Sequence, residues 1–115
     1  GGLKEITIPS SVTSIGLFAF ASTPSLEKIV FEPNSSVTKI EAGAFMEIPK
    51  LTTLIIPETV TKLGDFAFED SNSLTVFTNV YSKPGGWDSQ WNSANRPIYW
   101  KDQWMLDKKG NPKIK

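Results

Sequence analysis

Three carboxylates near the middle of the 115-residue chain are the first candidates for chemistry: Asp65, Glu69 and Asp70. A paired acid and base can cleave a glycosidic bond, and clustered carboxylates can bind calcium. The chain has no His and no Cys, so the commonest general base, thiolate metal sites and disulfides are all excluded. Glu69 and Asp70 directly follow Phe68, a Phe that recurs at a fixed spacing, and the alternative to a site is a solvated turn. We expect no catalytic residue, no bound metal and no cofactor.

Four tryptophans form two pairs of equal spacing, Trp87 with Trp91 and Trp100 with Trp104. Paired indoles can stack on sugar rings, so a carbohydrate-binding module is one hypothesis. The alternative is structural: a short helix from Trp87 to about Asn92 would place two indoles on one face, covering the end of a stacked core. We favour this second interpretation, which makes Trp87 and Trp91 core residues. Full burial of the indoles would exclude a sugar site.

The elements that must position these residues come from a phrase that occurs three times. The pattern V-T-x-[I/L]-x-x-x-A-F spans residues 12–20, 37–45 and 60–68, and a Leu follows each final Phe by six residues. A phrase that returns at a fixed period indicates a repeat protein. One unit cannot bury its own apolar residues, whereas stacked units align like residues in columns. Phe20, Phe45 and Phe68 are therefore predicted to be core residues.

The repeats divide the chain into three regions. These are leucine-bearing repeats at 1–81 (units 3–25, 26–50 and 51–73 and a partial unit 74–81), a C-terminal cap at 82–100 and a tail at 101–115. Each unit opens with L-x-x-[I/L]-x-[I/F], the alternation of a strand, and a proline then turns the chain. The pattern predicts a solenoid, mostly β, with one short parallel strand per repeat, turns and little helix.

These residues resemble a known family. The phrase L-x-x-I-x-I-P-x-S-V-T-x-I-G-x-x-A-F, at 3–20 and with similar residues at 51–68, resembles the BspA-type (Treponema-type) leucine-rich repeat. The resemblance covers 3–81 and extends into 82–92, which is similar to the segment that closes such arrays. It implies a curved leucine-rich-repeat solenoid with a parallel sheet on its concave side. The family commonly has Cys at three positions that are here Thr23, Ile48 and Ser71, and unit two has Ile40-Glu41 in place of I-G.

The resemblance also implies a place and a class of role. Proteins of this family are secreted or surface-anchored in bacteria, and some bind host matrix proteins or other cells. We therefore expect an extracellular or cell-surface location and an unidentified protein partner. Two alternatives stay open, a structural spacer in a larger surface protein and the carbohydrate-binding module.

Outward-pointing strand residues are the candidates for a binding surface, because in a solenoid they line one continuous face. Val30 and Ile55 are apolar where the pattern does not require it, and Thr7 and Thr78 would flank them. Isolated exposed aliphatic residues are ordinary, so the alternative is that this strip binds nothing. The candidate binding face comprises Lys4, Glu5, Thr7, Lys28, Val30, Thr53, Ile55, Val76 and Thr78.

Charge and hydropathy bear on partners. Lys plus Arg and Asp plus Glu number 12 each, so we expect no nucleic-acid partner. No apolar run approaches the roughly 18 residues that a membrane span needs, and we expect no direct membrane insertion. The tail carries five Lys and two Asp around Gly110, and it reads as a hairpin or as the start of another module.

The N-terminal end gives one further expectation. The chain begins with Gly-Gly and enters a repeat at once, as a piece of a longer protein would. Leu3, Ile6 and Ile8 would then start an uncovered edge strand. Such an edge favours self-association through the first repeat.

Overall fold

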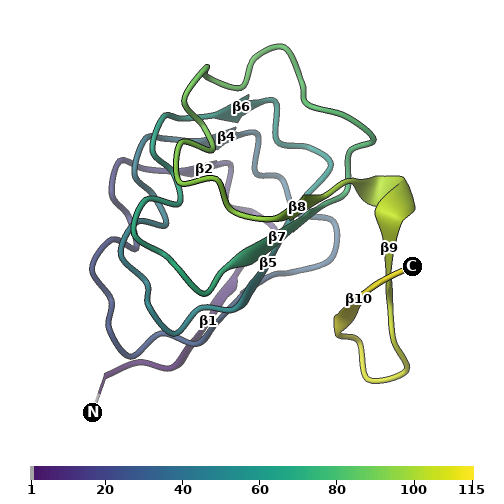
Figure 1. The fold of residues 1–115 in the computed structure, drawn as a ribbon, viewed down its shortest axis with the longest axis horizontal. Helices are drawn as coiled ribbons and strands as arrows, with labels where there is room; N and C mark the ends of the chain where they lie inside the picture. The colour runs from purple at the N-terminus through teal and green to yellow at the C-terminus, as the bar shows by residue number, and fades with distance from the viewer. Residues whose placement is uncertain (1) are drawn as a thin grey trace.

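The computed structural model describes residues 2–115 and forms a solenoid of about four turns (Figure 1). Each turn opens with a four-residue strand: β1 (Glu5–Ile8), β3 (Lys28–Phe31), β5 (Thr53–Ile56) and β7 (Thr75–Thr78). A second, shorter strand follows in the first three turns: β2 (Ser14–Ile15), β4 (Lys39–Ile40) and β6 (Lys62–Leu63). These strands pair in parallel with the equivalent strand of the next turn, except that β3 and β5 are not paired. The predicted leucine-rich-repeat solenoid is confirmed.

The interior is built from the repeated residues, which stack in columns. Phe45 and Phe68 are fully buried, and the rings of Phe20, Phe45 and Phe68 stack at centroid distances of 5.8 and 6.2 Å. Trp91 continues this column, its ring meeting that of Phe68 edge-on at 6.4 Å. Phe20 is only half-buried, because it lies in the first turn. Burying one such side chain is worth about 1.5–3 kcal/mol, so the Phe column is a main source of stability.

A ladder of backbone hydrogen bonds runs along the third side of each turn. Phe18 N–H donates to Ala42 O at 3.1 Å, and Phe45 N–H donates to Ala67 O at 2.9 Å. Tight turns make this side compact, and Gly43 adopts a φ of +65° there. At Gly64 a side chain is excluded, since a Cβ would lie 2.3 Å from Ala42 N. The outer turns are therefore rigid supports for the two sheets.

The two sheets differ in continuity. β2, β4 and β6 form one uninterrupted three-stranded ladder, whereas within residues 2–115 the opening strands split into a β1–β3 pair and a β5–β7–β8 sheet. The split coincides with a proline. Ile8 O accepts a hydrogen bond from Glu32 N–H, and Ile56 O accepts one from Asn79 N–H, each at 3.0 Å. Pro57 occupies the equivalent position opposite Phe31 and has no N–H to donate.

The C-terminal cap closes the last turn without the helix that we predicted. Residues 87–92 form consecutive turns, in which Trp91 N–H donates to Asp88 O at 3.1 Å. The prediction of a helix was wrong because turns let both indoles reach inward while the backbone follows the last repeat. Arg96 also seals this end, its Nε donating to Leu74 O at 2.9 Å. β8 (Ile98–Tyr99) then pairs in parallel with β7.

The tail forms a hairpin, one of the two alternatives that its sequence left open. A 3₁₀ turn, η1 (Lys101–Gln103), leads into β9 (Trp104–Leu106), which pairs antiparallel with β10 (Pro112–Ile114). Gly110 lies in the connecting turn with a φ of +83°. Figure 1 shows the hairpin projecting from the last turn and lying beside the solenoid.

Candidate binding groove

Seven of the nine predicted face residues do lie on the outward side of the opening strands. Register places Thr7 beside Val30 and Glu5 beside Lys28. Lys4, Glu5, Thr7, Lys28 and Thr53 are exposed, and Val30 and Ile55 are half-buried. The two apolar side chains thus form part of one surface on neighbouring turns.

Val76 and Thr78 are not on this surface, so the prediction for them was wrong. Both are fully buried. The register pairs Thr53 with Thr75 and Ile55 with Phe77, which places Val76 beside the inward Leu54 and Thr78 beside the inward Ile56. The fourth turn is therefore one residue shorter than the repeat spacing implies.

The shift has a physical reason. With the predicted spacing Asn79 would point into the core, where an unpaired amide costs free energy. The observed register buries Thr78 instead, and its hydroxyl donates to Val80 O at 3.0 Å. Phe77 takes the outward position, but only 4% of it is exposed. The tail covers it.

Trp104 fastens the hairpin to the outward face. Its indole N–H donates to Thr78 O at 2.9 Å, and its ring lies 5.4 Å from that of Phe77. The ring of Tyr99 stacks on that of Phe77 at a centroid distance of 5.6 Å. An aromatic cluster therefore holds the base of the hairpin in place, and it ends the open outward face at the fourth turn.

The turn of the hairpin is also well defined. One carboxylate oxygen of Asp107 accepts hydrogen bonds from Lys109 N–H at 2.8 Å and from Asn111 N–H at 2.9 Å. Asp107 N–H donates to Asn111 O at 2.8 Å. A side chain that bonds its own turn in this way fixes the backbone. Lys109 and its neighbours are thus presented on a shaped loop.

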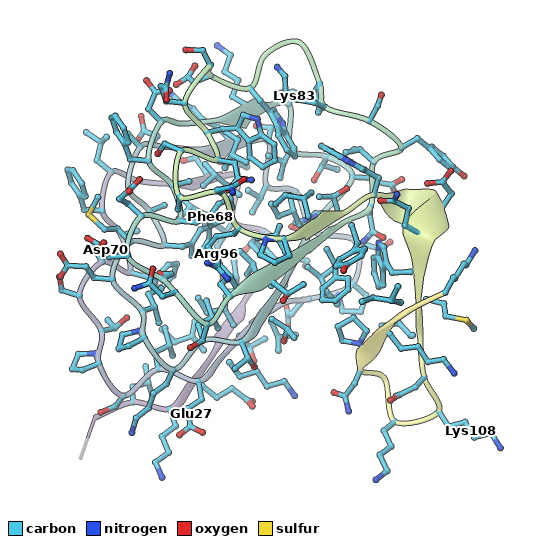
Figure 2. The ribbon with its side chains drawn as sticks, viewed as in Figure 1. Glu27, Phe68, Asp70, Lys83, Arg96 and Lys108 are labelled. Atoms are coloured by element: carbon cyan, nitrogen blue, oxygen red, sulfur yellow. The ribbon has the colours of Figure 1, made fainter. Side chains whose placement is uncertain are left out.

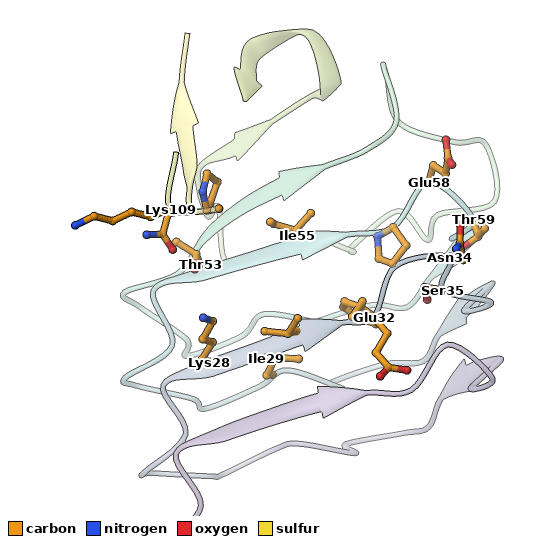
Figure 3. Close-up of a pocket in the computed structure, with 16 residues that line it drawn as sticks. Lys28, Ile29, Glu32, Asn34, Ser35, Thr53, Ile55, Glu58, Thr59 and Lys109 are labelled. Atoms are coloured by element: carbon orange, nitrogen blue, oxygen red, sulfur yellow. The ribbon is translucent and has the colours of Figure 1, made fainter. Parts of the chain in front are cut away.

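A groove of about 350 Å³ opens between this loop and the outward face of β3 and β5. The groove lies where the neighbouring strands β3 and β5 are not paired. Its floor includes Val30 and Ile55, and the loop supplies its wall through Lys109, Gly110, Asn111 and Pro112. Figure 3 draws the lining residues, with Ile55 on β5 and Lys109 on the hairpin loop among those labelled. Four predicted residues, Lys28, Val30, Thr53 and Ile55, line it.

Charge is separated along the groove. Lys28 and Lys109 lie at the end where the strands begin, and Glu32 and Glu58 lie towards the end where they finish (Figure 3). Lys28 also approaches Glu5 at 4.0 Å, but both side chains are 58% exposed and such a contact contributes little. Glu32 accepts a hydrogen bond from Ser10 N–H at 2.8 Å, which orients its carboxylate.

Two of the three clustered carboxylates, Asp65 and Glu69, make hydrogen bonds to the cap. Asp65 accepts a hydrogen bond from Gln90 N–H at 2.9 Å, and Glu69 accepts one from the Ser93 hydroxyl at 2.6 Å. Asp70 is exposed on the outer rim, as Figure 2 shows. Asp65 and Glu69 thus tie the cap to the third turn. Within residues 2–115 no group of three His, Cys, Asp or Glu is placed to hold a metal ion.

The tryptophans form a structural cluster as well. Trp87 is 3% exposed and donates its indole N–H to Val60 O at 3.2 Å. Its ring contacts those of Trp91 at 4.8 Å and Trp100 at 5.9 Å. Trp104 is likewise buried, while Trp91 and Trp100 are half-buried. Full burial, the condition that would exclude a sugar site, is thus met by Trp87 and Trp104 and not by Trp91 and Trp100.

Sequence reasoning missed the half of the groove that comes from outside the strands. Glu32 and Glu58 lie in turns, where charged residues carry no distinctive signal. The loop residues belong to the tail, whose position depends on the contact between Trp104 and Phe77. The one available hint was the net positive charge of residues 101–115.

Comparison with known proteins agrees with this geometry. Residues 2–82 match the family model of the BspA-type leucine-rich repeat region, described as having six copies. Among solved structures the chain is similar to the crystal structure of a leucine-rich cell surface protein from Faecalibacterium prausnitzii A2-165, with 27% identity and a TM-score of 0.64. The similarity covers 97% of this chain and 26% of that protein. The chain therefore spans about a quarter of that relative's length.

Two further findings complete the comparison. No curated protein matches the chain. No helix within residues 2–115 has the length and apolar character needed to cross a membrane. Repeat phrase, solenoid architecture and family match coincide over the same residues, and the chain belongs to the BspA-type leucine-rich repeat family.

Proposed function

We propose that the chain is a non-catalytic binding and display module of a bacterial cell-surface or secreted protein, and that it acts by protein–protein contact through the groove. One observation carries this proposal: the outward face of β3 and β5 and the hairpin loop form a single hollow. The cell-surface description of the structural relative supports the location. Adhesion to host matrix or to other cells is the corresponding biological role.

The floor of the groove suits a protein partner. Val30 and Ile55 present apolar surface, and Lys28, Lys109, Glu32 and Glu58 surround it with charge. An apolar centre with a polar rim is the usual anatomy of a protein interface. The carbohydrate alternative loses its best residues, since the indole N–H groups of Trp87 and Trp104 bond to backbone carbonyls inside the protein.

Binding to purified matrix proteins and to bacterial cells tests the proposal. The protein is passed over immobilised collagen, laminin and fibronectin and over fixed cells, beside the double variant Val30→Ser/Ile55→Ser. A matched control, Leu17→Ser/Phe66→Ser, removes two aliphatic or aromatic side chains that are 62% and 46% exposed and do not line the groove. We expect the groove variant to lose at least about tenfold in affinity and the control to keep it.

Two results would contradict the proposal. The first is equal binding by the protein and by the folded groove variant. The second is absence of binding to every surface in the panel, which would favour the spacer. Melting curves for both variants establish that the fold is intact.

A further inference from the structure

The charges of the groove define what kind of segment fits it. Lys28 opens β3 and Glu32 directly follows its end, so four residue steps separate them. A strand rises about 3.3 Å per residue, so the two side chains are about 13 Å apart along the groove. The second cation, Lys109, comes from the loop and the second carboxylate, Glu58, from the turn after β5. Each end of the groove therefore has one charge of its sign from each of two segments.

The middle of the groove is uncharged. Val30 and Ile55 form its floor, while Pro112 and Gly110 lie on the loop side. Phe31 also borders the groove, but its side chain packs against the core, so we do not count its ring as a stacking surface for a ligand. Among the described residues that line the groove there is no Trp or Tyr. This composition suits a small aliphatic side chain and gives a sugar ring nothing to stack on.

We propose that the groove binds an extended peptide segment of about five residues with an acidic side chain at one end, a small aliphatic side chain in the middle and a basic side chain at the other. The acidic side chain lies between Lys28 and Lys109, the basic one between Glu32 and Glu58. In an extended segment, residues one, three and five point to the same side and span about 13 Å, which matches the separation of the charges. The inference rests on the proposed function and specifies the chemistry of its partner.

Three synthetic peptides with blocked termini test the charge pattern: Asp-Thr-Val-Thr-Lys, Asp-Thr-Val-Thr-Asp and Lys-Thr-Val-Thr-Lys. Each is titrated into the whole ¹⁵N-labelled chain at low salt and followed by amide NMR shifts. We expect the first peptide to bind at least about fivefold more tightly than the other two, with shifts at Val30, Ile55 and Gly110. Raising the salt to about 1 M shortens the screening length to about 3 Å and should remove the preference.

Charge reversal at one end of the groove should switch the preference. Glu32→Lys/Glu58→Lys makes both ends basic and should favour the diacidic peptide, and Lys28→Glu/Lys109→Glu makes both ends acidic and should favour the dibasic one. All four residues are exposed, so neither double change disturbs the core. The matched control is Lys62→Glu on β6, which changes an exposed lysine outside the groove. This variant should rank the three peptides by affinity in the same order as the unchanged protein.

Three results would overturn the inference: no saturable shifts, equal affinity for all three peptides, or a preference that charge reversal does not switch. Shifts centred on Leu17 and Phe66 would do the same, because they would place the peptide on another face. If the peptides fail while Val30→Ser/Ile55→Ser still abolishes matrix or cell binding, the inference fails and the proposed function stands. If the peptides bind but the protein binds none of the matrix proteins or cells, the peptide specificity stands and the proposed adhesive role fails.

Discussion

The two strand ladders of this solenoid are built from the same repeat, yet one is continuous and the other is interrupted. The short strands β2, β4 and β6 form an unbroken ladder. The longer opening strands are interrupted between β3 and β5, and a hairpin from the tail stands over that interruption. The short strands thus form a continuous ladder, whereas the interrupted opening strands and the hairpin form the groove. The proposed function accordingly assigns recognition to the opening strands and the hairpin, apart from the residues that stabilise the fold.

Three features of the turns and the tail produce the shaped surface. Pro57 removes an amide donor where β5 meets β3. The fourth turn shortens by one residue, which brings Phe77 outward. Trp104 then packs on Phe77 and holds the hairpin. None of these features touches the Phe column, so the fold tolerates them.

Removing a ring from the Phe column should have the largest effect on stability. Phe45→Ala is expected to cost about 3–5 kcal/mol, because the ring is fully buried between two others. Phe20→Ala should cost clearly less, since Phe20 is half-buried in the first turn. Denaturant unfolding of both variants measures the difference. Equal losses would mean that the first turn is as well packed as the second.

A buried hydroxyl gives the next largest effect. Ser71 is fully buried, donates to Phe45 O at 2.6 Å and accepts from Ile48 N–H at 2.9 Å. Ser71→Ala leaves that N–H and that carbonyl unpaired, which should cost about 1–3 kcal/mol. Ser71→Cys should cost less, because a thiol still offers a weak donor and acceptor. Thermal melts rank the variants, and a Cys variant below the Ala variant would contradict this account.

Restoring the missing amide tests the split in the sheet with a smaller effect. Pro57→Glu copies Glu32, the residue at the same position one turn earlier, and supplies an N–H opposite Phe31 O. A hydrogen bond there is worth about 0.5–1.5 kcal/mol, partly offset by the greater freedom that the unfolded chain gains without proline. Hydrogen exchange at residue 57 should be slow. Fast exchange there would show that something other than proline separates β3 from β5.

The parts that sequence could predict are those that repeat. Residues 12–20, 37–45 and 60–68 predicted the Phe column, because the period follows directly from burial. One strand was predicted per repeat, whereas each of the first three turns has two. The register of β7 could not be predicted, since it depends on whether Asn79 or Thr78 enters the core. The loop side of the groove could not be predicted either, because the tail meets the strands only through the distant pair Trp104 and Phe77.

The most direct test of the separation between stability and recognition is one pair of measurements on Val30→Ser/Ile55→Ser. Both side chains are half-buried and lie outside the buried core, so the melting temperature should stay within a few degrees of that of the unchanged protein. Affinity for whichever matrix protein, cell surface or peptide binds the unchanged protein should fall at least about tenfold. A variant that keeps its affinity and melts much earlier would contradict the account, because Val30 and Ile55 would then serve the fold and not the partner.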